Sequence, residues 1–305
     1  MIFFYKEFGE LGYLASYSNH GFFEKNNYYK TTEHYYQSEK VISKQIQRKI
    51  INASTPREAS YIGRDRNNTQ RKLWKLIKCD VMYYGVLNKF IQNKDILNKL
   101  LSTGNEEIIE ETVRENYWGI GINRDGQNNY GKILELVRNR LRSDNMSYYT
   151  KEGYEKLEKE ILSIDDEYID TTTKMGVSDS IDSDLRENPE FMDLRVKAMY
   201  ALPAKKVQLM KDKKNAIIIE DTDEYKNWDC QTVSRKCKVT LVTDGEIEDF
   251  TILGANEGNI RENILSCEAP LVLALLNHSL GETIKFNGMN IKIESIKRIE
   301  KELIR

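Results

Sequence analysis

The chain has 305 residues, enough for two or three domains that each bury a core of their own. Its four cysteines form no CxxC pair, it has only three histidines, and no run of about 18 apolar residues occurs. This composition argues against a zinc site, a disulfide framework and a membrane partner, and predicts a soluble cytoplasmic protein. The formal charge of -2 conceals a basic segment at residues 1–145, where 23 Lys or Arg stand against 17 Asp or Glu, as suits an anionic ligand or nucleic acid.

Helical patterns dominate residues 1–143, which we predict to form the N-terminal domain. The sequence Thr55-Pro56-Arg57-Glu58 is that of a capping box, so we expect a helix to begin there and to end near Gly63. Apolar residues recur at helical spacing over residues 70–91 and predict the core helix of this domain. Further helices are predicted at residues 31–44, 94–102, 105–113 and 130–142.

The helix predicted at residues 31–44 carries a row of polar side chains. Glu33, Gln37 and Lys40 are spaced i, i+4 and i+7, which places a carboxylate, an amide and an amine on one helix face. Such a row is most often a solvated stripe. It can also line a pocket in which Glu33 handles a proton or orients water, while Lys40 meets an anion or a sugar carbonyl carbon. The spacing alone leaves both interpretations open.

A longer series of motifs spans nearly all of residues 1–142. It comprises Glu33-His34-Tyr35-Tyr36-Gln37 with Lys40, Thr55-Pro56, Gly63-Arg64-Asp65-Arg66, Trp74, Lys78, Met82, Lys89-Phe90, Leu100-Leu101-x-Thr103-Gly104, Trp118-Gly119-x-Gly121 and Gly126-x-Asn128-x-x-Gly131. In this order and spacing the motifs resemble the NADAR family. That family is associated with NAD and ADP-ribose derivatives. Its members resemble N-glycosidases that release ADP-ribose from modified guanine or ribose phosphate from riboflavin precursors.

The resemblance implies roles for individual residues. Glu33 and Lys40 become the expected catalytic pair, because a carboxylate can stabilise the cationic ribose of N-glycosidic cleavage and an amine can form a Schiff base with the opened sugar. The expected ligand-binding residues are Gln37, Arg64, Asp65, Trp118, Gly119, Gly121, Gly126, Asn128 and Gly131. Free N–H groups where the last of these motifs leads into a helix would favour phosphate. No intrinsic cofactor is expected.

Residues 146–215 are predicted to form an antiparallel coiled-coil hairpin. Apolar residues recur every three or four positions in both halves, and the arms are expected to join near residues 176–188. Pro203 is expected to kink the second arm. The threonine-rich and glycine-containing run at 171–176 is expected to shorten or loosen the first arm. The tip is acidic, with nine Asp or Glu at residues 165–190.

Residues 216–305 are predicted to form a small β-rich domain. Strands are expected at 237–243, 248–254, 282–286 and 289–299, and a short helix at 269–277. Asn287-Gly288 between the last two strands is a strong signal for a type I′ hairpin turn.

A second series of motifs covers residues 148–300. It comprises Gly153-Tyr154-Glu155-Lys156-Leu157, Asp184-Leu185-x-Glu187-Asn188-x-Glu190-Phe191, Ile252-Leu253-Gly254, Ala269-Pro270-Leu271 and Ala274-Leu275-Leu276. In this order they resemble the Gre transcript-cleavage factors. The resemblance implies a coiled-coil hairpin with an FKBP-like domain that docks at the secondary channel of bacterial-type RNA polymerase. Asp184 and Glu187 would then be catalytic tip residues and metal ligands, holding Mg²⁺ supplied at the polymerase active site. By their chemistry alone they are ordinary acidic residues of a solvated loop.

These expectations describe an α+β multidomain protein with a mostly α-helical NADAR-like domain (1–143), an antiparallel coiled-coil hairpin (146–215) and a small FKBP-like β-rich domain (216–305). The leading hypothesis is an N-glycosidase, or ADP-ribosyl hydrolase, that removes ADP-ribose from guanine in nucleic acid or from a related conjugate and is tethered to RNA polymerase. One alternative is a polymerase-binding elongation regulator whose NADAR domain senses a nucleotide or is inactive. Another is an N-glycosidase of riboflavin-pathway ribosylamines.

Overall fold

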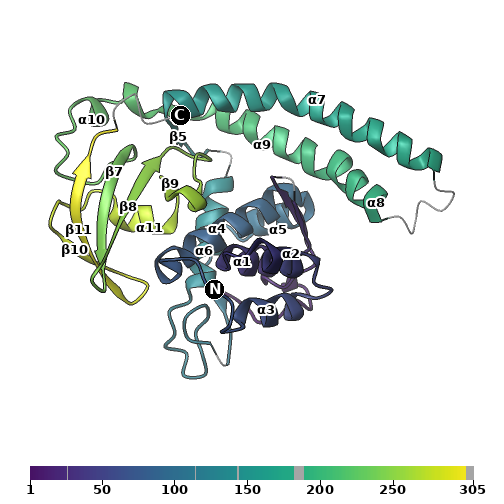
Figure 1. The fold of residues 1–305 in the computed structure, drawn as a ribbon, viewed down its shortest axis with the longest axis horizontal. Helices are drawn as coiled ribbons and strands as arrows, with labels where there is room; N and C mark the ends of the chain where they lie inside the picture. Colours follow the sequence, from purple (N-terminus) through teal and green to yellow (C-terminus); the bar gives the residue numbers. More distant parts are fainter. Residues whose placement is uncertain (26, 114, 143, 182–188, 300–305) are drawn as a thin grey trace. The chain divides into compact units, whose positions relative to one another are not determined.

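The computed structural model describes residues 1–305 except 26, 114, 143, 182–188 and 300–305 (Figure 1). The chain divides into two compact units. One comprises Met1–Trp74, Val81–Ser143 and Glu160–Met210, and the other Lys75–Asp80, Asp144–Lys159 and Lys211–Arg305. Among the described residues, no helix combines the length and the apolar character needed to cross a membrane.

Residues 1–142 form a mainly helical fold with short strands at its edges. The helices are α1 (Thr32–Lys40), α2 (Lys44–Asn52), α3 (Pro56–Arg64), α4 (Trp74–Gln92), α5 (Lys94–Ser102) and α6 (Asn129–Leu141), with a 3-10 turn at Gly12–Leu14. Strand β1 (Ile2–Phe4) pairs in parallel with β4 (Ile108–Glu110), and β2 (Phe22–Glu24) pairs antiparallel with β3 (Asn27–Tyr29). The core gathers fully buried apolar side chains of α4 and α6, among them Val81, Val86, Phe90, Leu134 and Val137.

The capping box at Thr55 is confirmed. The Thr55 hydroxyl accepts the N–H of Glu58 at 3.1 Å, and the Glu58 carboxylate accepts the N–H of Ser54 at 2.7 Å, so both orphan donors at the start of α3 are satisfied. The helix predicted at 31–44 instead ends at Lys40, because Val41 is extended and forms a bridge with Gln70.

The helix predicted at residues 105–113 is wrong. Ile108–Glu110 form β4, which pairs with β1 near the start of the chain. Ile108 and Ile109 are both buried there, and the Ile108 N–H donates to Glu135 Oε1 at 2.8 Å. β-Branched side chains such as these fit a half-buried strand. The paired strand β1 lies about a hundred positions earlier in the chain, so a local sequence pattern could not indicate the pairing.

The predicted hairpin is built from two antiparallel arms (Figure 1). The first arm is α7 (Lys151–Ile181), and the returning arm consists of α8 (Pro189–Val196), a π-helical turn (Lys197–Ala201) and α9 (Leu202–Lys214). Ion pairs join the arms in antiparallel order: Lys197–Glu167 at 2.7 Å, Lys205–Glu160 at 2.6 Å and Lys213–Glu158 at 2.9 Å. Of the predicted seam, Leu157, Ile164 and Leu209 are buried, whereas Tyr168 is exposed. That the arms form a coiled coil stays a prediction.

The expected shortening of the first arm is wrong, since α7 continues through residues 171–176 to Ile181. The Thr171 hydroxyl donates to the Glu167 carbonyl at 2.7 Å, and the Thr173 hydroxyl donates to the Ile169 carbonyl at 2.8 Å. The threonines therefore bond back to the preceding turn instead of breaking the helix. Pro203 is the second residue of α9, two positions after the end of the π-helical turn, which widens the helix where the proline ring and its missing N–H disrupt regular bonding.

The C-terminal residues build a five-stranded sheet in the order β10-β11-β7-β8-β9, antiparallel except for the pair β8 and β9. The strands are β7 (Cys237–Thr243), β8 (Glu246–Leu253), β9 (Ile264–Ser266), β10 (Thr283–Phe286) and β11 (Met289–Lys297), with α11 at Pro270–Leu275. Strand β7 alternates buried and half-buried residues along its length. Asn287 and Gly288 both have positive φ, 52° and 78°, so the predicted type I′ turn is confirmed. The FKBP-like assignment stays a prediction.

Short elements link the base of the hairpin to this sheet. They are β5 (Ser147–Tyr149), which pairs in parallel with β6 (Ala216–Ile218), the 3-10 turn Ile219–Asp221 and α10 (Asp223–Lys226). A further 3-10 turn, Ile260–Glu262, lies between β8 and β9.

A partly buried carboxylate fixes the start of α7. Glu257 accepts the N–H of Thr150 at 2.9 Å and its hydroxyl at 2.7 Å, and the same hydroxyl oxygen accepts the N–H of Gly153 at 2.9 Å. A Cβ on Gly153 would lie 2.0 Å from Glu257 Oε1. The close approach of this carboxylate therefore requires glycine.

Candidate active site

Glu33 is a buried carboxylate on the first turn of α1. Glu33 is only 5% exposed to solvent, and its backbone N–H donates to the Ser16 carbonyl at 3.1 Å. Gln37, one turn further on, donates from Nε2 to Glu33 Oε1 at 2.8 Å. Burial raises the pKa of Glu33, and Gln37, Ser60, Arg64 and Lys40 act in the opposite direction. The interpretation of this row as a solvated stripe is wrong, because Glu33 and Gln37 are both buried.

Helix α3 passes close to the Glu33 row. A Cβ on Gly63 would lie 2.3 Å from Gln37 Oε1, so only glycine permits this approach of the two helices. Gln37 Oε1 is buried and accepts no hydrogen bond from the described residues. A buried amide oxygen of this kind is available to a ligand donor or a water.

Lys40 and Arg64 bring positive charge to the same place. Lys40 is half-buried and Arg64 is exposed. The pKa of Lys40 is lowered by burial and by the Arg64 guanidinium, while Glu33 raises it. An amine with a lowered pKa holds more of its neutral, nucleophilic form at neutral pH.

Sequence reasoning missed Tyr17 and Ser60. Ser60, on α3, is buried beside both Glu33 and Tyr17, yet its hydroxyl completes no hydrogen bond of standard geometry among the described residues. Burial and the Glu33 carboxylate raise the pKa of the Tyr17 phenol. Ser60 follows the capping box by two positions and Tyr17 lies in a loop, so no spacing rule joins either residue to Glu33. The fold alone brings them together.

Trp118 packs against Tyr36 of α1. Its ring meets Tyr36 edge to face at 5.6 Å and Tyr117 at 4.9 Å, and Tyr36 also contacts Trp74 at 5.0 Å. Trp118 is only partly buried, so part of its surface is open to a ligand. The indole is thus joined to the Glu33 helix through Tyr36.

Several predicted ligand-binding residues also have contacts within the fold, and their role in ligand binding stays a prediction. Asn128 is buried, accepts the Glu110 N–H at 3.0 Å and donates to the Ile108 carbonyl at 2.8 Å, which clamps β4 to the start of α6. A Cβ atom on any of the four predicted glycines would collide with this same loop and strand. The Cβ of Gly119 would lie 2.3 Å from Thr112 Oγ1, and that of Gly126 would lie 2.5 Å from the Gly119 carbonyl oxygen. The Cβ of Gly121 would meet the Asn116 side-chain amide, and that of Gly131 would meet the Ile108 carbonyl oxygen. These contacts explain the residues by close packing.

The free N–H groups expected at the start of α6 are also absent from its first residues. The Asn129 N–H donates to the Tyr117 carbonyl at 3.3 Å, and the Tyr130 N–H donates to the Trp118 carbonyl at 3.0 Å. These donors are satisfied by the chain and are not available to a phosphate.

Asp65 and His34 also have structural explanations. Asp65 is exposed at the end of α3, where its carboxylate accepts the Asn67 N–H at 2.9 Å in a local turn. His34 is fully buried, with Nδ1 2.8 Å from the Thr31 hydroxyl and Nε2 3.2 Å from the Ala53 carbonyl. Both ring nitrogens are therefore engaged within the fold.

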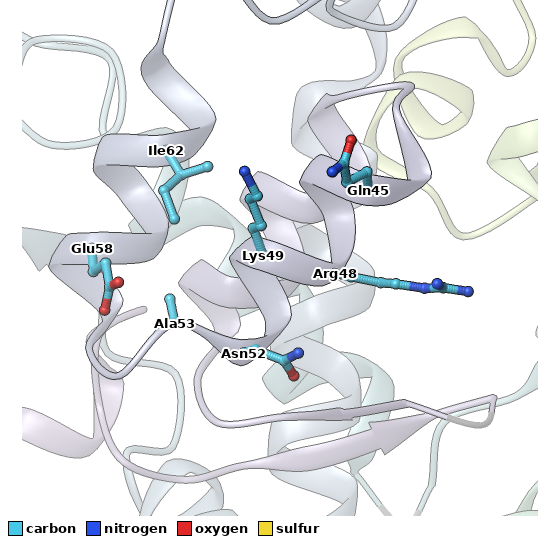
Figure 2. A pocket seen from close by; sticks show the side chains of 7 residues that line it. All are labelled: Gln45, Arg48, Lys49, Asn52, Ala53, Glu58 and Ile62. Atoms are coloured by element: carbon cyan, nitrogen blue, oxygen red, sulfur yellow. The ribbon is translucent and has the colours of Figure 1, made fainter.

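A separate pocket of about 540 Å³ opens between α2 and α3 (Figure 2). It is lined by Gln45, Arg48, Lys49, Asn52, Ala53, Glu58 and Ile62. Glu58 and Ile62 are spaced i, i+4 on α3, on the opposite face from Ser60 and Arg64. The pocket therefore does not belong to the Glu33 site.

Asp184 and Glu187 lie outside the described residues, so their roles stay predictions. In the part of the chain that the structure describes, no group of three or more His, Cys, Asp or Glu side chains could hold a metal ion.

Comparison with known proteins identifies the domain that carries this site. Residues 3–142 match the NADAR domain family. Over 145 residues the chain is 37% identical to an N-glycosidase of Nostoc punctiforme, an alignment that spans 47% of this chain and 93% of that protein. The chain belongs to the NADAR family.

Two further NADAR relatives extend the comparison. A riboflavin biosynthesis protein of Vibrio vulnificus is 32% identical over 140 residues, which are 46% of this chain and 38% of that protein. The NMR structure of Escherichia coli YbiA is 30% identical, with a TM-score of 0.44, and covers 46% of this chain and 83% of its own.

The C-terminal part matches a different family. Residues 229–300 match the C-terminal domain of the transcription elongation factors GreA and GreB. The predicted joining of a NADAR domain to a Gre-type module is thereby confirmed.

Proposed function

We propose that this chain is an N-glycosidase that releases ADP-ribose from modified guanine in nucleic acid, or from a related ADP-ribose conjugate. The observation that carries the proposal is the buried Glu33 carboxylate, held by Gln37 and flanked by Lys40, in a domain whose relative from Nostoc punctiforme is named an N-glycosidase. Glu33 and Lys40 are its catalytic residues.

Breaking an N-glycosidic bond leaves positive charge on the ribose C1 and ring oxygen. A carboxylate fixed in a water-poor site stabilises that charge more strongly than one in bulk water. Glu33 meets this requirement, because Gln37 holds one oxygen at 2.8 Å. From this position, Glu33 can also take a proton from the water that attacks C1.

Lys40 offers a second route through the same site. Its lowered pKa favours the neutral amine, which can attack C1 of the ring-opened conjugate. The bond from C1 to the guanine nitrogen then breaks, the nitrogen takes up a proton and leaves as an amine, and C1 is left as a Schiff base to Lys40. Water hydrolyses this Schiff base, which releases ADP-ribose and the free Lys40 amine. Arg64, exposed beside the pair, suits the pyrophosphate of ADP-ribose, because its charge lies close to both catalytic groups. Trp118 offers a partly open ring for stacking on a base.

The Gre-type module supports a location at RNA polymerase. Residues 229–300 match the GreA/GreB family, and α7 is a 31-residue helix that leads from their unit towards the predicted acidic tip. We propose that this module docks at the secondary channel of a bacterial-type polymerase. There Asp184 and Glu187 would hold Mg²⁺ of the polymerase active site and stimulate RNA cleavage.

A second candidate function follows from one comparison. The match to a riboflavin biosynthesis protein favours ribosylamine intermediates of that pathway as substrates. Both candidates use the same bond cleavage at Glu33, and they differ in the group attached to ribose.

A substrate panel separates these functions. The full chain is incubated with a guanine-ADP-ribosylated oligonucleotide and with a ribosylamine 5-phosphate precursor, and released sugar is measured by mass spectrometry. We expect release from the oligonucleotide, at least a hundredfold slower with Glu33→Gln and slowed by Lys40→Ala. The exposed residues Glu107 and Lys44 supply matched controls, Glu107→Gln and Lys44→Ala, which should act like wild type. Release from the precursor alone would favour the second function, and tight ADP-ribose binding without turnover would favour a sensor.

The tether is tested on the same full chain. Purified bacterial RNA polymerase should be retained by the immobilised protein and displaced by an excess of a free Gre factor. Retention that the Gre factor does not reduce would contradict docking at the secondary channel.

A further inference from the structure

Glu110 is a second carboxyl group of the NADAR domain, and its backbone is fixed from two sides. It ends strand β4, where its N–H donates to Asn128 Oδ1 at 3.0 Å and its carbonyl accepts the Ile120 N–H at 3.0 Å. The side chain therefore starts from a rigid point between the Asn128 clamp and the loop that carries Trp118. Rigid placement of this kind is what a group acting on a bound molecule requires.

One carboxyl oxygen of Glu110 is buried without a hydrogen-bond partner among the described residues. Oε2 is inaccessible to solvent and has no hydrogen bond to any residue that the structure describes. The titratable groups that interact electrostatically with it are Glu115 from the following loop, Glu33 from α1 and the Tyr130 phenol from α6. The Tyr130 hydroxyl donates to the Leu14 carbonyl at 2.8 Å, so it is not a donor to Glu110.

This environment keeps a proton on Glu110. Burial, then the negative charges of Glu115 and Glu33, raise its pKa to about 8. Burial raises the pKa of Glu33 as well, although Gln37, Ser60, Arg64 and Lys40 act against that rise. Two electrostatically coupled carboxyl groups in different surroundings can serve as the acid and the base of one site.

Glu110 is one of three residues coupled to Glu33 that carry a buried polar atom without a hydrogen-bond partner among the described residues. Gln37 Oε1 and Ser60 Oγ, like Glu110 Oε2, are buried without a hydrogen-bond partner among the described residues. All three belong to residues around or electrostatically coupled to Glu33. Buried polar atoms are normally bonded, so several orphans around one carboxylate indicate a bound polar ligand or water.

We propose that Glu110 is the general acid of this site, and that it protonates the leaving nitrogen of the substrate while Glu33 acts on the ribose. This inference rests on the proposed N-glycosidase function. As the bond between C1 and nitrogen breaks, the Glu110 proton passes to the nitrogen, which leaves as a neutral amine. Water adds its hydroxyl to C1 and gives its proton to Glu33. Transfer of one proton from Glu33 to Glu110 through solvent restores both groups, so the net reaction adds one water.

The kinetic test uses two leaving groups. Glu110→Gln should slow release from the guanine conjugate by about 10²–10⁴-fold, because proton donation to the amine is lost. The same variant should slow the cleavage of an ADP-ribose conjugate of 4-nitrophenol by less than about tenfold, because this leaving group needs no proton. Wild-type kcat/KM should fall as the pH rises through about 8, and the variant should lack that fall. Glu107→Gln is the matched control. Equal slowing of both substrates would overturn the inference and assign Glu110 a structural role.

A titration tests the same inference without a substrate and without relying on a variant of Glu110. Carbon-13 NMR of the wild-type full chain should show the Glu110 carboxyl titrating near pH 8, and Glu33→Gln should lower that midpoint by removing a negative neighbour. A midpoint near the ordinary 4.5 would overturn the inference. If wild type leaves the guanine conjugate intact but cleaves the nitrophenyl conjugate, the proposed substrate fails, while the titration still decides the protonation of Glu110.

Discussion

Replacing Lys89 with methionine should remove a pH dependence from the folding stability. Lys89 is fully buried in α4, and its Nζ donates to the Ala15 carbonyl at 2.9 Å and the Leu14 carbonyl at 3.5 Å. The next residue, Ser16, accepts the backbone N–H of Glu33. Lys89 therefore anchors one wall of the candidate active site. Burial lowers its pKa from 10.5 to about 7.

The sign of the effect follows from proton binding. The unfolded chain holds the Lys89 proton up to about pH 10.5, whereas the folded chain releases it near pH 7. Between these values the unfolded state binds more protons, so stability rises with pH. A shift of this size raises the free energy of unfolding by about 2 kcal/mol from pH 7 to pH 9. In Lys89→Met both carbonyl oxygens still accept a hydrogen bond, because the Tyr130 hydroxyl donates to the Leu14 oxygen and the Ser18 N–H donates to the Ala15 oxygen.

The assay is urea denaturation at pH 7, 8 and 9 of wild type, Lys89→Met and Lys94→Met, the last a control at an exposed lysine of α5. Other titrating groups contribute equally to all three proteins, so the difference between curves isolates Lys89. From pH 7 to pH 9 the free energy of unfolding of wild type and of the control should rise by about 2 kcal/mol more than that of Lys89→Met. Parallel curves for all three would refute the reasoning.

Two further predictions concern packing and hydrogen bonds. Gly153→Ala should lower the free energy of unfolding by about 1–3 kcal/mol, because its Cβ would meet the Glu257 carboxylate at 2.0 Å. Gly176→Ala lies in the same helix but its Cβ would have no atom within 4 Å, so it should raise the free energy of unfolding by about 0.5–1 kcal/mol. Both are measured by denaturant titration, and equal effects of the two substitutions would contradict this account. Asn128→Asp keeps the acceptor but loses the donor to the Ile108 carbonyl, so thermal unfolding should show a loss of about 1–3 kcal/mol, and an unchanged midpoint would mean that the clamp contributes nothing.

Elements with strong local signals were predictable from the sequence. The capping box at Thr55 satisfies donors within four residues, and the Asn287-Gly288 turn needs only two residues that tolerate positive φ. Strand β4 was not predictable, because Ile108–Glu110 become a strand only by pairing with β1 at the other end of the domain. The end of α1 depends in the same way on a bridge between Val41 and Gln70.

The candidate site was predictable along one helix but not across elements. Helical spacing placed Glu33 and Gln37 on one face, and their contact at 2.8 Å agrees with it. Ser60 on α3 and Glu110 on β4 interact with Glu33 from other elements, so no sequence period connects them. The only signal for Glu110 was its place directly after two isoleucines that favour a strand. Asn128 also holds the backbone of β4 through two hydrogen bonds, a structural role that its place in the motif did not indicate.

The central claim is that Glu33 is the catalytic carboxylate of an N-glycosidase. Its most direct test is a single-turnover reaction of excess full-length protein with a guanine-ADP-ribosylated oligonucleotide, in which free ADP-ribose and unmodified guanine are both quantified. Wild type should form the two products in equal amounts, and Glu33→Gln, which keeps the size of the side chain, should form them at least a hundredfold more slowly. Equal rates for wild type and Glu33→Gln would contradict the claim.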